Sequence, residues 1–119
     1  MLDLLVKDRL LRILESIRLI NERTEMLDQP YDLVSSSDSM LLDSIAMRLQ
    51  VIGEHVKKIN SVDPLIFQEK LQIDPDPIIR FRDFISHHYD KTDYEIIFDI
   101  IKTNLPFLEN QIHNFLSNN

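Results

Sequence analysis

A single glycine, Gly53, in a chain of 119 residues restricts the folds that this sequence can form. β-Sheets use glycine in their hairpins and tight turns, so a chain with 44% hydrophobic residues and one glycine favours helices. The length suits one hydrophobic core and is too short for two. We therefore expect one all-α domain that spans residues 1–119.

Apolar residues recur at spacings of three and four along three long stretches, as expected for helices with one buried face. The first stretch predicts a helix that Pro30 ends, and the second predicts a helix that continues to about Asn60. The third predicts a helix that starts at Thr92 and bends at Pro106, where one backbone hydrogen bond is lost. The stripes are Val6, Leu10, Ile13, Ile17, Ile20, Thr24 and Leu27; Leu41, Ile45, Leu49, Ile52, Val56 and Ile59; and Ile97, Ile101, Leu105, Leu108, Ile112 and Phe115.

Two further segments complete the predicted fold, an antiparallel bundle of four main helices plus a short one. The short helix is expected over Pro64–Lys70, and the fourth main helix over Pro77–His88, opened by a cap and a proline. Tyr31–Asp38 is expected to be a polar connection. Gly53 lies in the middle of the second helix, where glycine costs about 1 kcal/mol relative to alanine. We expect this cost to be compensated by the close approach of another backbone.

Charge and composition limit the class of function. The net charge of −7 argues against a protein that coats nucleic acid by bulk electrostatics. The absence of cysteine excludes a disulfide framework and thiolate metal ligands. Charged residues interrupt the apolar first 20 residues, so neither a signal-peptide core nor a membrane span is expected there. We expect a cytoplasmic protein without contact to a membrane.

Residues 82–89 hold the strongest candidate site, because an arginine, two histidines and a tyrosine lie close together there. Arg82, His87 and Tyr89 suit metal-free cleavage of RNA. Histidine can move protons near neutral pH, and the planar fork of arginine can hold a phosphate as charge develops on it. The alternative is structural: Arg82 pairs with a carboxylate, while His87 and His88 cap the end of the helix. No metal site or bound cofactor is expected, because the histidines do not have the HExxH spacing.

Helix geometry limits how Arg82 and His87 can act together. They are five positions apart, so on an ideal helix their side chains point about 140° apart. One copy of a straight helix would not direct both at one phosphate. Either the helix breaks near His87, or two chains face each other and share the site. His88 continues the apolar face, so we expect it to be structural. His55 and His113 are expected to be ordinary surface or rim residues.

The spacing Arg82-x4-His87-x-Tyr89 resembles the signature of the HEPN ribonucleases, and specifically of the HepT toxin family. The segment from Arg48 through Gly53 to Glu54 resembles the second helix of this family. Asn104-Leu105-Pro106 resembles its bent last helix. The resemblance extends over nearly the whole chain.

The resemblance implies a HEPN-type helical bundle that forms a homodimer in which two Arg-x4-His motifs meet in one cleft. It also implies a metal-independent endoribonuclease toxin with Arg82 and His87 as catalytic residues. The implied partner is an MNT-type nucleotidyltransferase antitoxin, which uses ATP to adenylylate Tyr89. Candidate supporting residues are Asp83, His88, Glu54 and Arg48. Asp83 stands where many members have asparagine. A non-catalytic HEPN adaptor, which only binds a nucleotidyltransferase or a nucleotide, is the alternative, and the acidic net charge favours it.

Overall fold

The computed structural model describes residues 3–35, 40–88 and 93–118, and these ranges contain helices and no strand. The elements are α1 (Leu4–Thr24), η1 (Pro30–Leu33), α2 (Met40–Val62), η2 (Ile66–Leu71), α3 (Asp76–His88), α4 (Tyr94–Asp99), η4 (Ile100–Asn104) and α5 (Leu105–Ser117). The predicted all-α bundle is confirmed. In this described part of the chain, no helix is long and apolar enough to cross a membrane.

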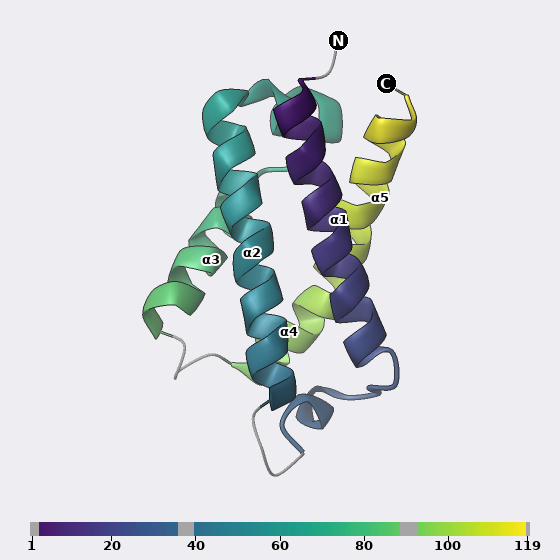
Figure 1. Cartoon of the computed structure of the whole chain (residues 1–119). Coiled ribbons are helices and arrows are strands. Elements are labelled where there is room, and N and C mark those ends of the chain that lie inside the picture. Colours follow the sequence, from purple (N-terminus) through teal and green to yellow (C-terminus); the bar gives the residue numbers. More distant parts are fainter. Residues whose placement is uncertain (1–2, 36–39, 89–92, 119) are drawn as a thin grey trace.

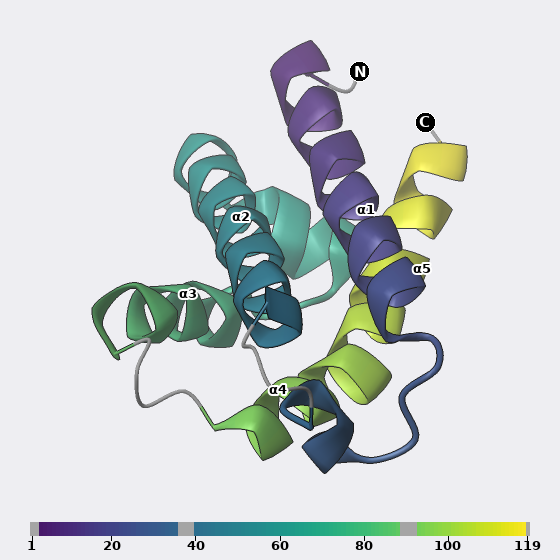
Figure 2. The same cartoon turned by 60° about the horizontal axis from the view of Figure 1, so that its bottom comes forward.

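The long helices α1 and α2 lie side by side and run in opposite directions (Figure 1). The helix α5 packs on α1, and α3 packs on α2. The two views place α3 on the side of α2 that faces away from α1 (Figures 1 and 2). The helix α2 therefore has one edge against α1 and the other against α3.

The predicted apolar stripes form the core of the bundle. On α1, Leu10, Ile13, Ile17 and Ile20 are completely buried. The stripe of α2 from Ile45 to Ile59 and that of α4–α5 from Ile97 to Phe115 are buried as well. Each such side chain stabilises the fold by about 1.5–3 kcal/mol relative to an exposed one. The spacing of apolar residues therefore identified the buried faces correctly.

The first helix ends earlier than the sequence predicts. It stops at Thr24, whose hydroxyl donates to the carbonyl of Ile20, and a turn follows in which the N–H of Leu27 donates to the carbonyl of Thr24. Leu27 still packs against the core, which explains why the apolar spacing continues past the helix. Pro30 does not end the helix but starts η1, a 3-10 turn with a buried Leu33. The predicted polar connection Tyr31–Asp38 therefore begins within this turn, and its residues 36–38 lie outside the described part of the chain.

The helix of the last third is interrupted just before Pro106, as predicted. The interruption is the π-helical turn η4, in which the N–H of Leu105 donates to the carbonyl of Ile100, five residues earlier. This wider turn takes the place of the hydrogen bond that proline cannot make. The short predicted helix is also π-helical; it spans Ile66–Leu71 and ends at Gln72, which has a left-handed backbone with φ of 55°.

Candidate functional site

The position of α3 is set by its first turn and by its buried face. The Asp74 carboxylate accepts a hydrogen bond of 3.0 Å from the N–H of Asp76, which caps the start of the helix. Ile85 is buried in the core, and Ile78 and Phe81 pack against its edge. These contacts leave Arg82 and Ser86 on the side of α3 that faces α2.

Gly53 lets α3 approach α2 at Arg82. A Cβ atom built on Gly53 would lie 2.3 Å from Arg82 Cβ, 2.8 Å from Arg82 Cγ and 3.5 Å from the carbonyl oxygen of Ile78. Real Cβ atoms do not come this close to other atoms, so a side chain at position 53 would push the two helices apart. The predicted close approach at the glycine is confirmed, and its partner is the candidate catalytic arginine.

Arg82 lies between two carboxylates, and its side chain is 25% exposed. Nη2 is 2.7 Å from Glu54 Oε2 on α2, and Nη1 donates to Asp83 Oδ1 at 2.9 Å. The first contact is close in distance but lacks hydrogen-bond angles, so Glu54 Oε2 and Arg82 Nε have no hydrogen-bond partner among the described residues. Glu54 and Asp83, expected as supporting residues, are therefore in contact with Arg82.

The ion pair between Arg82 and Asp83 favours the charged form of both groups, because it shifts the pKa of each. The hydrogen bond from Arg82 lowers the pKa of Asp83, and the positive charges of Lys57, Arg82 and His87 act in the same direction. The hydrogen bond to Asp83 is also the main reason why the pKa of Arg82 is raised above its ordinary value. A phosphate that binds Arg82 must therefore compete with an ionised Asp83. The predicted structural alternative, an arginine paired with carboxylates, describes this part of the geometry.

His87 is exposed on the same helix, which stays α-helical through His88. No break separates Arg82 from His87, so their side chains leave the helix about 140° apart. Of the two arrangements expected from the sequence, a broken helix near His87 has no support in the described residues. Ser86, one turn after Arg82, accepts a hydrogen bond of 2.6 Å from Gln50 on α2.

The remaining predicted site residues are separate from Arg82 or lie outside the described part of the chain. Arg48 lies seven residues before His55 on α2, so both share a helix face, and His55 contacts α1. Arg48 is therefore on the α1 side of α2, away from α3. Tyr89 and the side chain of His88 lie outside the described residues. Among the described residues, no three histidine, aspartate or glutamate side chains are close enough to hold a metal ion.

Two contacts were not foreseen from the sequence. The first is the hydrogen bond between Gln50 and Ser86, which ties α2 to α3 beside Arg82. Its signal was partly visible, because Ser86 lies on the same stripe of α3 as Arg82. The second is the contact between Arg9 and His55, which the sequence does not indicate because it depends on how α1 and α2 are aligned.

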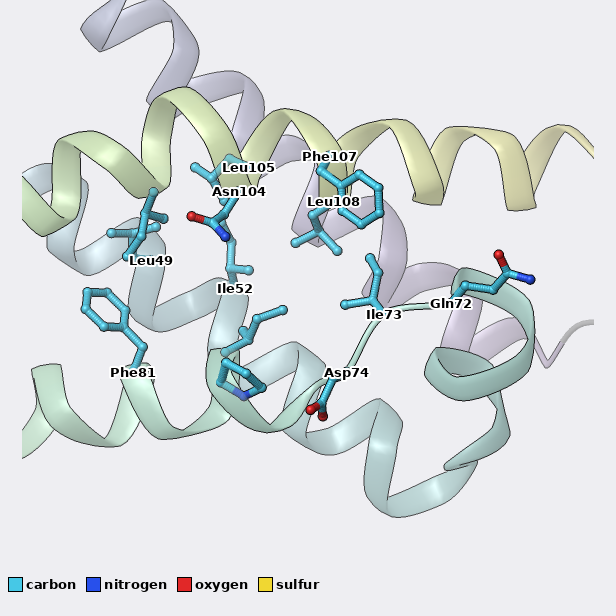
Figure 3. A pocket seen from close by; sticks show the side chains of 13 residues that line it. Leu49, Ile52, Gln72, Ile73, Asp74, Phe81, Asn104, Leu105, Phe107 and Leu108 are labelled. Atoms are coloured by element: carbon cyan, nitrogen blue, oxygen red, sulfur yellow. The ribbon is translucent and has the colours of Figure 1, made fainter.

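An apolar cavity of about 450 Å³ lies between α3, α2 and α5 (Figure 3). Phe81 and Ile78 of α3 line it together with Leu49 of α2 and Phe107 of α5. Its walls are mainly apolar, and Asp74 is its one ionisable lining residue. The cavity has neither Arg82 nor His87 in its lining, so it is distinct from the candidate catalytic site.

The comparison with protein families agrees with the motif. The model of the HepT-like family, which is described as 'Ribonuclease HepT-like', matches residues 13–115. This chain belongs to the HepT-like family. The matched range covers most of the chain and includes the contact between Gly53 and Arg82 as well as His87. No curated protein and no solved structure matches this HepT-like chain.

Proposed function

We propose that this HepT-like protein is a metal-independent endoribonuclease whose catalytic centre combines Arg82 of one copy with His87 of a second copy. The observation that carries the proposal is the uninterrupted helix between these residues. Their side chains diverge by about 140° on one chain, so a phosphate can contact both only if a second chain supplies one of them. Membership of a family named for ribonucleases supports the same reaction.

In this proposal Arg82 is the cation that stabilises the transition state. The Cβ and Cγ atoms of its side chain are held against Gly53, and Glu54 holds one side of the guanidinium. A fixed cation of this kind stabilises the negative charge that develops on the non-bridging phosphate oxygens during cleavage, without having to reorganise. Nη1 leaves Asp83 and binds a phosphate oxygen, so substrate binding exchanges one anionic partner for another.

His87 is the proton-transfer group in this proposal. It is exposed, so a substrate bound to the facing copy can reach its imidazole. The imidazole takes the proton of the ribose 2′-hydroxyl, whose oxygen attacks phosphorus, or gives a proton to the leaving 5′-oxygen. Either transfer needs a group that titrates near neutral pH, and histidine is the side chain that ordinarily does so.

The biological role that we propose is that of a toxin. The motif implies a cognate MNT-type nucleotidyltransferase antitoxin that inactivates the enzyme by adenylylating Tyr89. The adenylyl group carries a negative charge, which would pair with Arg82 and obstruct a site shared by two copies. We also propose that the protein acts in the cytoplasm, where its RNA substrate is present.

The decisive experiment is RNA cleavage by purified protein in the presence of EDTA. Wild type and His88→Ala are expected to cleave, whereas Arg82→Ala and His87→Ala are expected to be inactive while keeping their helical circular dichroism. Cleavage at equal rates by wild type and His87→Ala would indicate a contaminating nuclease. A wild type that binds a nucleotidyltransferase and cuts no RNA would instead support the adaptor.

The adaptor remains the second candidate because of one observation. Arg82 already contacts two carboxylates. The whole chain is also acidic, and both features weaken the attraction of the protein for a polyanion. An adaptor would not need Arg82 to bind phosphate, and the ion pairs would then serve to hold α3 on α2. The EDTA assay separates the two functions because only the nuclease loses activity with His87→Ala.

A further inference from the structure

The edge between α1 and α2 carries a cluster of positive charge on an otherwise acidic protein. Arg9 Nη1 of α1 lies 3.3 Å from His55 Nδ1 of α2. Arg12 is one turn after Arg9 on α1. Lys58 is about one turn after His55 on α2, at a position adjacent to it on the helix surface. Arg48 lies two turns before His55 on the same face. We call these five residues the cationic face.

The cationic face has fewer carboxylates than cations. Asp8 pairs with Arg12 at 2.9 Å, and Glu54 lies 3.8 Å from Lys58. Among the described residues, neither Arg9 nor Arg48 forms a salt bridge. Four permanent cations against two carboxylates leave 4 − 2 = +2 before His55 takes up a proton, in a chain with a net charge of −7.

The lowered pKa of His55 is consistent with a positive potential at this face. Its half-buried position lowers its pKa, and the charges of Arg9, Arg12 and Lys58 lower it further. Asp8 opposes this effect but does not reverse it. An anion placed beside the imidazole would relieve the repulsion among these groups, so the face is better suited to an anion than to water alone.

The cationic face is connected to the candidate catalytic arginine. Glu54 contacts Lys58 through Oε1 and Arg82 through Oε2. His55, the next residue of α2, contacts Arg9 on the opposite edge of the helix. Charged side chains therefore run from α3 across α2 to α1. These three helices lie next to one another in this order in both cartoon views (Figures 1 and 2).

We propose that the cationic face binds phosphates of a single-stranded RNA other than the scissile phosphate, which binds at Arg82. This inference rests on the proposed ribonuclease function. Arginine recognises phosphate with two parallel donors. Arg9 has no carboxylate partner in the described part of the chain, and its contact with His55 uses Nη1 alone, so its other donors can serve this purpose. The strand enters or leaves the catalytic centre over α2 and continues across the edge where α2 meets α1.

RNA fits this face better than an acidic protein or a membrane, because the cations continue from a site that itself needs a phosphate. The face also gives an acidic enzyme a means to bind a polyanion. Long RNA would contact both Arg82 and the cationic face, whereas a dinucleotide would reach only the catalytic centre. The proposal therefore predicts a preference for longer substrates that depends on Arg9 and Arg12.

The test compares Arg9→Ala/Arg12→Ala with Arg18→Ala, each made on the non-cleaving His87→Ala protein. Arg18 is a matched control because it is exposed on α1 and pairs with Glu15 and Glu22 of its own helix. The probe is a labelled single-stranded RNA of twelve nucleotides, titrated at several salt concentrations. Each lost phosphate contact should reduce the salt slope by about 0.7, so the double variant should lose about 1.4 and bind roughly tenfold more weakly.

Cleavage supplies the second readout, on protein that keeps His87. The ratio of kcat/KM for the twelve-nucleotide RNA to that for a dinucleotide should fall roughly tenfold in the double variant and stay constant in Arg18→Ala. If Arg9→Ala/Arg12→Ala keeps the salt slope of its His87→Ala parent and the kcat/KM ratio of wild type, the proposal is wrong. A double variant that binds RNA normally but loses binding to vesicles with anionic lipids would also overturn it. If wild type cleaves nothing, the ribonuclease function fails, while the salt slope still decides whether the face binds RNA.

Discussion

Gly53 and Arg82 lie so close together that a methyl group on the glycine would be 2.3 Å from Arg82 Cβ. The contact joins the only glycine of the chain to the candidate catalytic arginine. It fixes the distance between α2 and α3 at the point where Arg82 must be held. The glycine therefore serves the site through packing, since its backbone has an ordinary helical conformation with negative φ.

Replacement of this glycine should destabilise the protein although alanine is the better helix former. Gly53→Ala is expected to lower the free energy of unfolding by about 1–3 kcal/mol through overpacking. Urea denaturation measures the change, and Lys57→Ala, on the exposed face of the same helix, is the control. Combining Gly53→Ala with Arg82→Gly removes the clashing Cβ, so the two changes should cost less together than the sum of each alone. A higher midpoint for Gly53→Ala than for wild type would show that the helices can separate at no cost.

A second prediction concerns the charge beside Arg82. The ionised Asp83 occupies Nη1, so Asp83→Asn should remove a competitor of the phosphate while Glu54 still holds Nη2. We expect kcat/KM for RNA to rise about fivefold at low salt, the effect of roughly 1 kcal/mol between charges about 4 Å apart in water. Glu69→Gln, which removes one exposed carboxylate elsewhere, is the control for net charge. A decrease with Asp83→Asn would mean that Asp83 helps to position Arg82.

The shared site predicts recovery of activity in mixed dimers. Arg82→Ala and His87→Ala should each be inactive alone, but a mixed dimer has one centre with an intact Arg82 from one chain and an intact His87 from the other. Mixing the two variants should therefore restore part of the cleavage. Light scattering should show a dimer in each sample. A monomer at micromolar concentration, or a mixture that stays inactive although subunits exchange, would contradict a catalytic centre made by two chains.

The sequence predicted the helices well because burial on one face imposes a spacing that a single sequence displays. Gly53 could also be identified as a point of close approach from its cost in a helix. Its partner could not be predicted, since the contact with Arg82 depends on how α3 crosses α2. The same limit applies to Arg9 and His55, whose contact depends on the alignment of α1 with α2. His55, expected to be a surface or rim residue, is half-buried at the edge between these two helices.

The end of the first helix was predicted wrongly because proline is a strong stop signal and apolar spacing continued up to it. A hydroxyl at Thr24 that bonds back to Ile20 gave no comparable signal. The interruption before Pro106 was predicted, since proline removes a known hydrogen bond. Its π-helical form was not, because the wider turn is one of several ways in which a helix can accommodate proline.

The low pKa of His55 predicts a stability that depends on pH. Burial and the charges of Arg9, Arg12 and Lys58 favour the neutral imidazole in the folded chain, while Asp8 opposes them. The unfolded chain takes up this proton at about pH 6.5, so the stabilisation is complete above that value and is lost as the pH falls below it. Wild type should therefore lose more stability than His55→Gln between pH 7.5 and pH 5, as measured by urea denaturation. His113→Gln, on the exposed face of α5, controls for replacing a histidine as such. Equal losses in wild type and His55→Gln would contradict the effect.

The proposed control by an antitoxin predicts a specific role for the hydroxyl of Tyr89. Only the phenolic oxygen can accept an adenylyl group, so Tyr89→Phe should keep RNA cleavage while escaping inactivation by the cognate nucleotidyltransferase and ATP. Tyr94→Phe is the matched control, because Tyr94 lies on α4 and packs edge-to-face on Tyr31 with ring centroids 6.3 Å apart. Mass spectrometry should find one adenylyl group on wild type and on Tyr94→Phe and none on Tyr89→Phe. Modification of Tyr89→Phe at another residue, or inactivation of the enzyme without any modification, would show that the antitoxin acts by a different route.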